Sequence, residues 1–352
     1  MTTHIQGMGW VTPLGNNLDE VWRRLISGEH GDAKEISSPH SKRTHQCIPV
    51  PLKQVEAIGK SPRLRRSSAI SYFTAAAGLA ALENAGIRMT PEIAERTAIV
   101  FAVSSGGVVY TRKFHEQIAQ QGAGAASPLL FPETVYNAPA SHLAALLGVT
   151  GATYTLVGDS SVGLSALKLA EQLLETTAVD RCLVVGGEEV DWVLCEAYSE
   201  WRLGAALAEG GAAIVLSRTG SIAMDEIHAG IPFQKQSEAA TAMDTVLGNL
   251  AADGNAKIDL VVSCANGTFI DLAEQRALER HLSGVPVYRP KEAFGESPGA
   301  GAIMQVIVAA LALSKREAPH GICLSPERAS CALVSCCGWN HQASGLILSG
   351  GE

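Results

Sequence analysis

The chain has 352 residues, a net charge of -8 and 35 glycines, with 47% hydrophobic and 18% charged residues. This length allows a large core, and the composition is typical of a globular α/β protein rather than a disordered one. The acidic charge, without a Lys/Arg stripe, argues against a nucleic-acid partner.

The first residues, MTTHIQGMGWVTPLG, show no charged segment followed by an apolar one. No apolar run reaches the length of about 18 residues that a membrane span requires. We therefore expect a cytoplasmic protein with no membrane partner. Eight cysteines, without CxxC or paired-histidine spacing, are expected to be small buried residues in a reducing compartment, and no metal site is predicted.

Strand-like runs alternate with helical patterns along the chain, which predicts an α/β architecture. Strands are expected at residues 5–11, 97–103, 154–158, 181–187, 211–217, 258–264, 320–325 and 331–337. Helices are expected at residues 18–27, 67–85, 110–120, 134–147, 162–176, 272–282 and 299–313. Residues 29–66 and 217–239 are expected to be irregular.

Two helical segments, VGLSALKLA and GAGAIMQVIVAALAL, are apolar on nearly every side. Such helices lie inside a protein. One falls in each half of the chain, so we expect two similar α/β halves, duplicated around a central pair of buried helices in five layers (αβαβα). The boundary is placed near Thr219, which gives an N-terminal half of residues 1–218 and a C-terminal half of residues 219–352.

The stretch YTLVGDSSVGLSALKLAEQLL, residues 154–174, has a small polar segment where a strand gives way to a buried helix. That position is typical of an active-site mouth, so Ser160 and Ser161 are candidate nucleophiles. The segment is not the GxSxG elbow of the hydrolases, because Gly158 and Gly163 are one residue too far apart. No GxGxxG, Walker or HExxH motif occurs, and no cofactor is predicted.

Several segments resemble the β-ketoacyl synthases of the thiolase fold, which extend acyl chains on acyl carrier protein. The segments are IQGMGWVTPLGNNLDEVWRRLISGEHG, RRSSAISYFTAAAGLAALENAGI, RCLVVGGEE, LAEGGAAIVLSR and CCGWNHQASGLIL. They follow the family order over nearly the whole chain. The resemblance implies a thiolase-like fold and a visiting phosphopantetheine arm carried by an acyl carrier protein.

The resemblance also implies that the reactive positions are substituted. The family nucleophile is a cysteine at the start of the first buried helix, and the aligned residue is Ser160, which a helix dipole alone does not activate. Asn266 in SCANGT and Glu296 in KEAFGES replace two catalytic histidines, and the family lysine is kept as Lys291. These four side chains are expected to form a hydrogen-bonded remnant in which Lys291 and Glu296 are paired.

The segment GWNHQAS matches a glycine-rich family segment whose phenylalanine gates the pocket. Trp339 is therefore expected at the gate. His341 lies in the same segment, close to the nucleophile position, and is a candidate base.

Three functions are compatible with these residues. The first is a chain-length factor, a non-catalytic subunit that pairs with an active ketosynthase of a type II fatty acid or polyketide synthase and shapes its acyl tunnel. The second is an acyltransferase with altered chemistry, in which Ser160 or Ser161 accepts the acyl group. The third is a condensing enzyme with Cys264 as a displaced nucleophile, although Cys264 is more simply a small buried strand residue.

Family members dimerise across the edge strand that precedes the nucleophile helix. The segment ATYTLVG is apolar and has no Lys or Pro to protect it, so it is expected to pair with a ketosynthase partner or a second copy, burying residues 155–158. The basic segment KSPRLRR, residues 60–66, is expected to be a solvated loop or a docking spot for an acidic partner.

Overall fold

The computed structural model describes residues 2–40, 42–200, 206–253, 257–322, 330–339 and 342–350. The strands are β1 (Thr3–Val11), β2 (Lys34–Ser37), β3 (Thr44–Ile48), β4 (Thr97–Val103), β5 (Thr153–Val157), β6 (Arg181–Glu188), β7 (Leu207–Ala208), β8 (Gly210–Ser217), β9 (Ile222–Pro232), β10 (Leu260–Val262), β11 (Val287–Tyr288), β12 (Cys331–Cys337) and β13 (Gln342–Gly350). The helices are α1 (Leu18–Ile26), α2 (Glu56–Gly59), α3 (Ala69–Asn84), α4 (Pro91–Glu95), α5 (Val108–Gln121), α6 (Ala138–Leu147), α7 (Val162–Leu174), α8 (Trp192–Glu200), α9 (Ala239–Asp253), α10 (Phe269–His281), α11 (Pro290–Phe294) and α12 (Gly301–Lys315).

The large sheet has the strand order β11-β10-β12-β13-β9-β1-β8-β6-β4-β5. We number the five strands of each half in chain order. From the outer edge of the sheet to its middle, they then lie in the order third, second, fourth, fifth and first in both halves. In both halves the second strand is parallel to the third and the fourth, and the remaining neighbours are antiparallel. A short contact between β1 and β9 joins the halves. The identical order and directions confirm the duplication that the sequence predicted.

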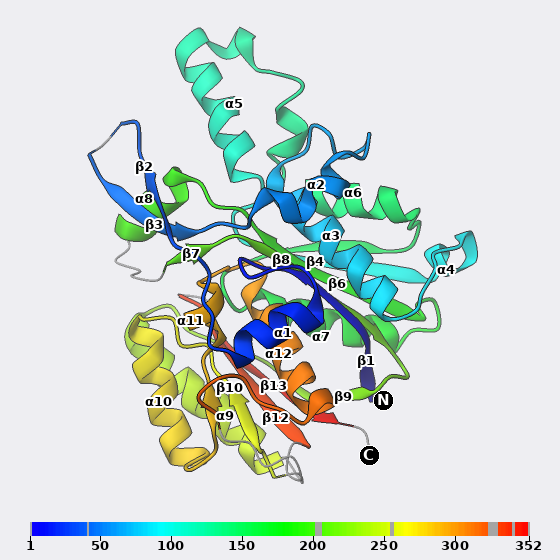
Figure 1. Ribbon diagram of the computed structural model, residues 1–352, viewed down its shortest axis with the longest axis vertical. Coiled ribbons are helices and arrows are strands. Elements are labelled where there is room, and N and C mark those ends of the chain that lie inside the picture. The colour runs from blue at the N-terminus through cyan, green and yellow to red at the C-terminus, as the bar shows by residue number, and fades with distance from the viewer. Residues whose placement is uncertain are drawn as a thin grey trace.

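Helices cover both faces of each half-sheet. Helix α3 packs on β1, β6 and β8, and α9 packs on the corresponding strands β9 and β13. Helices α7 and α12 lie together between the two halves of the sheet (Figure 1). The result is the expected five-layered, thiolase-like arrangement.

Small residues bring the two central helices together. A Cβ at Gly163 of α7 would lie 2.8 Å from the Cβ of Ala302 in α12, a distance that real Cβ atoms do not adopt. Every residue of α12 from Gly301 to Leu313 is buried. The apolar surface of both helices is therefore explained by their place between the sheets.

Two segments that we expected to be irregular contain strands. Residues 217–239 include β9, the first strand of the C-terminal half, in which Ile222, Met224 and Ile227 are buried. Charged residues between these positions conceal the strand pattern. Residues 29–66 include the hairpin β2–β3, which forms a small sheet with β7.

The strand expected at residues 320–325 is not observed in its described part, because His320 and Gly321 lie in a turn and Ile322 is irregular. Residues 323–325 are outside the described residues. Helices α2, α4, α8, α9 and α11 and strands β7, β11 and β13 were also not predicted from the sequence. Within the described parts of the chain, no helix combines the length and the apolar character needed to cross a bilayer.

Candidate functional site

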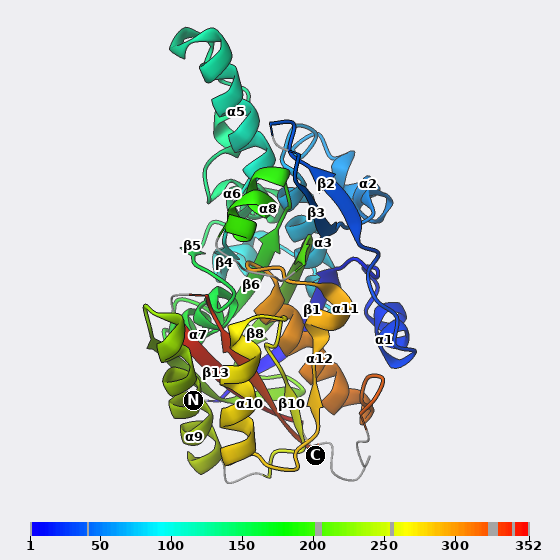
Figure 2. The same ribbon diagram turned by 90° about the vertical axis from the view of Figure 1, so that its left-hand side faces the viewer.

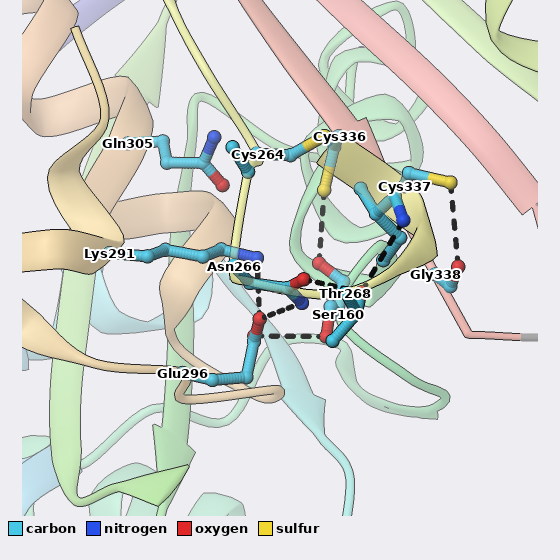
Figure 3. A network of polar contacts seen from close by, with 12 residues as sticks. Ser160, Cys264, Asn266, Thr268, Lys291, Glu296, Gln305, Cys336, Cys337 and Gly338 are labelled. Atoms are coloured by element: carbon cyan, nitrogen blue, oxygen red, sulfur yellow. Dashed lines mark hydrogen bonds and ion pairs between the residues drawn. The ribbon is translucent and has the colours of Figure 1, made fainter. Parts of the chain in front are cut away.

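Four loops meet at the start of α7. Ser160 lies in the turn between β5 and α7, and Asn266 follows β10. Glu296 lies between α11 and α12, and Trp339 follows β12. The structure thus brings together residues that are up to 179 positions apart in the sequence. Figure 3 shows Ser160, Asn266 and Lys291 gathered around Glu296.

Local structure fixes the backbone of these loops. The backbone N–H groups of Asn266 and Gly267 donate to the Asp271 carboxylate in the first turn of α10. The backbone of Glu296 is held by β7 and the residue before it, since its N–H donates to Ala206 O at 2.8 Å and its carbonyl accepts from Ala208 N at 2.7 Å. The side chains of both loops are therefore oriented before any ligand arrives.

The Glu296 carboxylate is the centre of a buried polar network. It accepts hydrogen bonds from Ser160 Oγ at 3.0 Å, from Asn266 Nδ2 at 2.7 Å and from Lys291 Nζ at 2.8 Å. Asn266 Oδ1 in turn accepts from Thr268 Oγ1 at 2.6 Å. Ser160 is 2% exposed and Glu296 is 1% exposed, so water contributes little to satisfying these groups.

The expected ion pair between Lys291 and Glu296 is present. Burial lowers the pKa of Lys291, but the Glu296 carboxylate, the nearby Cys336 and Cys264 and the hydrogen bond to Glu296 raise it, and the pKa is raised overall. Lys291 therefore stays charged. A carboxylate that is neutralised by a buried ammonium group is a poor base for the Ser160 hydroxyl.

Trp339 covers Ser160. Its indole Nε1–H donates to Ser160 Oγ at 2.9 Å, and its backbone N–H donates to Asp159 Oδ2 at 2.8 Å. Gly338 allows this close approach, because a Cβ there would lie 2.1 Å from Asp159 Oδ2. Tyr198 packs edge-on against the indole ring with the centroids 5.3 Å apart. The hydroxyl of Ser160 is thus covered by the indole of Trp339, and Tyr198 packs against that indole.

The other candidate nucleophiles, Ser161 and Cys264, are fully buried and have polar partners of their own. The Ser161 hydroxyl donates to Asp159 Oδ1 at 2.9 Å and is fully buried. Cys264 is fully buried, its Sγ lies 3.5 Å from Glu274 Oε1, and burial, with the nearby Glu274, raises its pKa well above that of a free thiol. Cys264 is therefore a protonated strand-end residue. His341 lies outside the described residues.

Sequence reasoning missed several members of the site. Cys336 Sγ donates to the Ser160 carbonyl at 3.0 Å, and burial raises the pKa of this thiol to about 12. Gln305 donates from Nε2 to the carbonyls of Ser263 and Ser335, at 2.9 Å each. Gln305 could have been found, since it is the one polar residue within the apolar run GAGAIMQVIVAALAL. Cys336 carried no comparable signal.

Residues 3–194 match the family model described as beta-ketoacyl synthase, N-terminal domain, and residues 214–324 match the C-terminal domain. The 3-oxoacyl-[acyl-carrier-protein] synthase 2 of Vibrio harveyi is 25% identical over 53% of this chain, and the match spans only 45% of that protein. The enzyme of the same name from Coxiella burnetii is 20% identical over 94% of this chain and 90% of its own length.

Solved structures share the fold. The ishigamide ketosynthase/chain length factor matches with a TM-score of 0.83 and 18% identity over 100% of both chains. A ketosynthase in complex with its chain length factor from Xenorhabdus doucetiae matches with a TM-score of 0.77 and 17% identity, over 99% of this chain and 98% of the other. At these identities the likeness concerns the fold alone.

Proposed function

The chain belongs to the β-ketoacyl synthase family, and on that premise we propose that it is a ketosynthase-like subunit of a type II fatty acid or polyketide synthase, including the polyene type. It acts as a chain-length factor, which pairs with an active β-ketoacyl-ACP synthase and shapes the tunnel that holds the growing acyl chain. Structural relatives named as ketosynthase and chain length factor pairs support this role.

One observation carries the proposal. At the start of α7 a hydroxyl is buried between the indole N–H of Trp339 and the carboxylate of Glu296. Carbon–carbon bond formation in this family needs a thiolate there, and two imidazoles beside it. In this chain the side chains at those positions form hydrogen bonds with one another.

The same contacts argue against an acyltransferase that uses Ser160. An acyl acceptor needs an adjacent base and access to the thioester. The carboxylate that accepts the Ser160 hydrogen bond is held by Lys291 and Asn266, and Trp339 occupies the approach.

The proposed halves of the chain, residues 1–218 and 219–352, form one compact unit. The boundary falls between β8, which ends at Ser217, and β9, which begins at Ile222. The repeated strand order on either side supports this division.

An apolar edge supports the pairing with a ketosynthase. Strand β5 is the last strand of the large sheet and bonds to β4 on one side. Tyr154 and Val157 of β5 are exposed. Helix α5 and the residues after it project as an arm beyond the sheet, above β5 in Figure 2, and carry further exposed apolar side chains. These are Leu129, Phe131, Val135 and Tyr136.

This face suits a partner subunit of the same fold, because an unpaired edge strand is completed by another strand. The arm then reaches across the partner and contributes apolar side chains beside its tunnel. A second copy of the chain is the alternative occupant of the same face.

The basic loop supports an acyl carrier protein as the third component. Arg63, Arg65 and Arg66 are exposed, and no ion pair involves them among the residues that the structure describes. Lys60 pairs with Glu56. Unpaired surface cations attract an acidic carrier. All three components act in the cytoplasm.

Co-expression with an active type II ketosynthase, followed by intact mass spectrometry, tests the proposal. We expect a mixed dimer, and no mass increase of this chain after incubation with several acyl-carrier proteins. A covalent acyl adduct that is lost in Ser160→Ala would reject the proposal that this chain is a non-catalytic subunit. Recovery of this chain only as a homodimer would reject the pairing.

A further inference from the structure

The arm of residues 108–136 is attached to the rest of the chain at its base. Figure 1 and Figure 2 show α5 projecting beyond the sheet. None of the 14 residues of this helix is buried. Within the arm, Phe114 packs against Phe131 with the ring centroids 5.8 Å apart. A helix of this length gains most of its stability from packing against other elements, so the contacts at the base have to hold the arm in place.

Both ends of the arm meet at Ser68, the residue before α3. Near the end of the arm, the Glu133 carboxylate accepts a hydrogen bond from the Ser68 backbone N–H at 2.9 Å. At its start, the backbone N–H of Val109 donates at 2.9 Å to the Glu189 carboxylate, which also accepts from the Ser68 hydroxyl. Gly107 lets the two ends touch, because a Cβ there would lie 2.2 Å from the Glu133 carbonyl oxygen and 3.4 Å from Ser68 Oγ.

These contacts are shielded from water. Ser68, Glu133 and Glu189 are 1%, 6% and 0% exposed. The second oxygen of Glu133 lies 2.6 Å from His142 Nε2, and Glu189 Oε2 also accepts from the Ile70 backbone N–H at 3.1 Å. Because water has little access here, a donor that is removed is not replaced, and its loss has its full cost.

Two further contacts at the base involve only the start of the arm. Tyr110 Oη donates to the Arg66 carbonyl at 2.8 Å, and Arg112 forms an ion pair with Asp191 at 2.9 Å. Neither contact involves residues 122–136. Ser68 differs from them because it bonds directly to one end of the arm and, through a shared carboxylate, to the other.

We propose that Ser68 is a positioning residue for partner binding. It holds both ends of the arm together, so that the exposed side chains of Leu129, Phe131 and Tyr136 are in place before a partner arrives. This inference rests on the proposed function, in which the arm contacts an active ketosynthase. An arm that is ordered in advance spares the complex the entropic cost of ordering it on association.

Hydrogen–deuterium exchange of the whole chain, without a partner, tests the hold on the arm. Ser68→Ala removes the hydroxyl and keeps the backbone N–H. The amides of residues 108–133 should exchange at least about tenfold faster, as the loss of a hydrogen bond to a carboxylate allows, while those of β8 keep their rates. Unchanged exchange in the arm, or equal acceleration in the arm and in β8, would overturn the proposal.

Ser71→Ala is the matched control. Ser71 lies in the first turn of α3 and is also 1% exposed, but its hydroxyl has no partner among the described residues. The same substitution there should leave the exchange of the arm unchanged. An effect equal to that of Ser68→Ala would count against a specific role of Ser68.

Glu189→Gln tests the same contact from its other side. In either orientation the new amide turns its NH2 group toward a backbone N–H, that of Val109 or that of Ile70, so the arm should again exchange faster. Unchanged exchange of the arm in this variant would also overturn the proposal.

The affinity for an immobilised active ketosynthase tests the role in partner binding. It should fall about tenfold in Ser68→Ala and stay unchanged in Ser71→Ala. Faster exchange of the arm without weaker binding would overturn this role. If the unmodified chain binds no ketosynthase, the proposed function fails, whereas the exchange rates of the chain alone still decide whether Ser68 holds the arm.

Discussion

The ion pair between Lys291 and Glu296 provides the sharpest test of the idea that this site is a closed remnant. The perturbation is a double-mutant cycle with Lys291→Met, Glu296→Gln and the double variant. Both side chains are almost completely buried. Removing one partner of a buried pair leaves an uncompensated charge and costs about 3–5 kcal/mol.

The double variant should cost much less than the sum of the single variants, because it leaves no buried charge. We expect a coupling energy of at least about 2 kcal/mol. Unfolding entropy scales with chain length, so for this chain 1 kcal/mol corresponds to a change in Tm of roughly 1–2 °C. Each single variant should therefore lower Tm by roughly 4–7 °C.

The assay is thermal unfolding at pH 7, followed by circular dichroism. Because the pKa of Lys291 is raised in the folded protein, its contribution is complete at this pH and is lost only as the pH rises through that folded value. The matched control is the exposed pair Lys60 and Glu56, whose side chains are 73% and 65% exposed. Lys60→Met should change Tm by about 1 °C or less. If the losses of stability in the two single variants add up to the loss in the double variant within about 0.5 kcal/mol, the reasoning is refuted.

Three further predictions concern other parts of the chain. Trp339→Ala should lower stability by about 3–5 kcal/mol in thermal unfolding, yet intact mass after incubation with acyl-carrier proteins should show no adduct on the uncovered Ser160; an adduct would mean that Trp339 alone suppresses its reactivity. Burial raises the pKa of Glu188 to about 8, so the folded state retains a proton that the unfolded chain loses, and stability should fall by up to about 1.4 kcal/mol per pH unit between about pH 5 and pH 8. Glu188→Gln should flatten that pH slope, and an unchanged slope counts against this group. Val157→Lys on β5 should prevent co-purification with a ketosynthase, whereas Leu272→Lys, at the same exposure of 53%, should not; equal effects would place the interface elsewhere.

The sequence predicted the layers of the fold because the central helices are unusually apolar. Because one such helix falls in each half of the chain, we predicted two similar halves packed around the pair. The strand order, which is the same in both halves, has this symmetry. Strand β9 was missed because its exposed side carries charged residues, so local composition resembled a connecting loop. The hairpin β2–β3 was missed for a similar reason, since most of its residues are exposed.

For the site, the resemblance identified residues that meet in space, but not all of the contacts among them. That Ser160, Asn266 and Lys291 converge on Glu296 could be expected from the positions they occupy. That Trp339 donates to Ser160 could not, because this contact depends on the fit of Gly338 against Asp159. Packing between residues that are far apart in the sequence leaves no local pattern from which it could be predicted.

The distribution of unspent hydrogen bonds separates the two sides of the remnant. On the side of Trp339, the Ser160 hydroxyl donates its proton to Glu296 and accepts from the indole, so its one donor is already used. On the side of Lys291, the contacts among the described residues use one ammonium donor, and Gln305 Oε1 of α12 is a buried acceptor without a partner among those residues. A buried polar group without a partner costs about 1–3 kcal/mol. These contacts agree with the proposal that the start of α7 has lost the reactivity of the family.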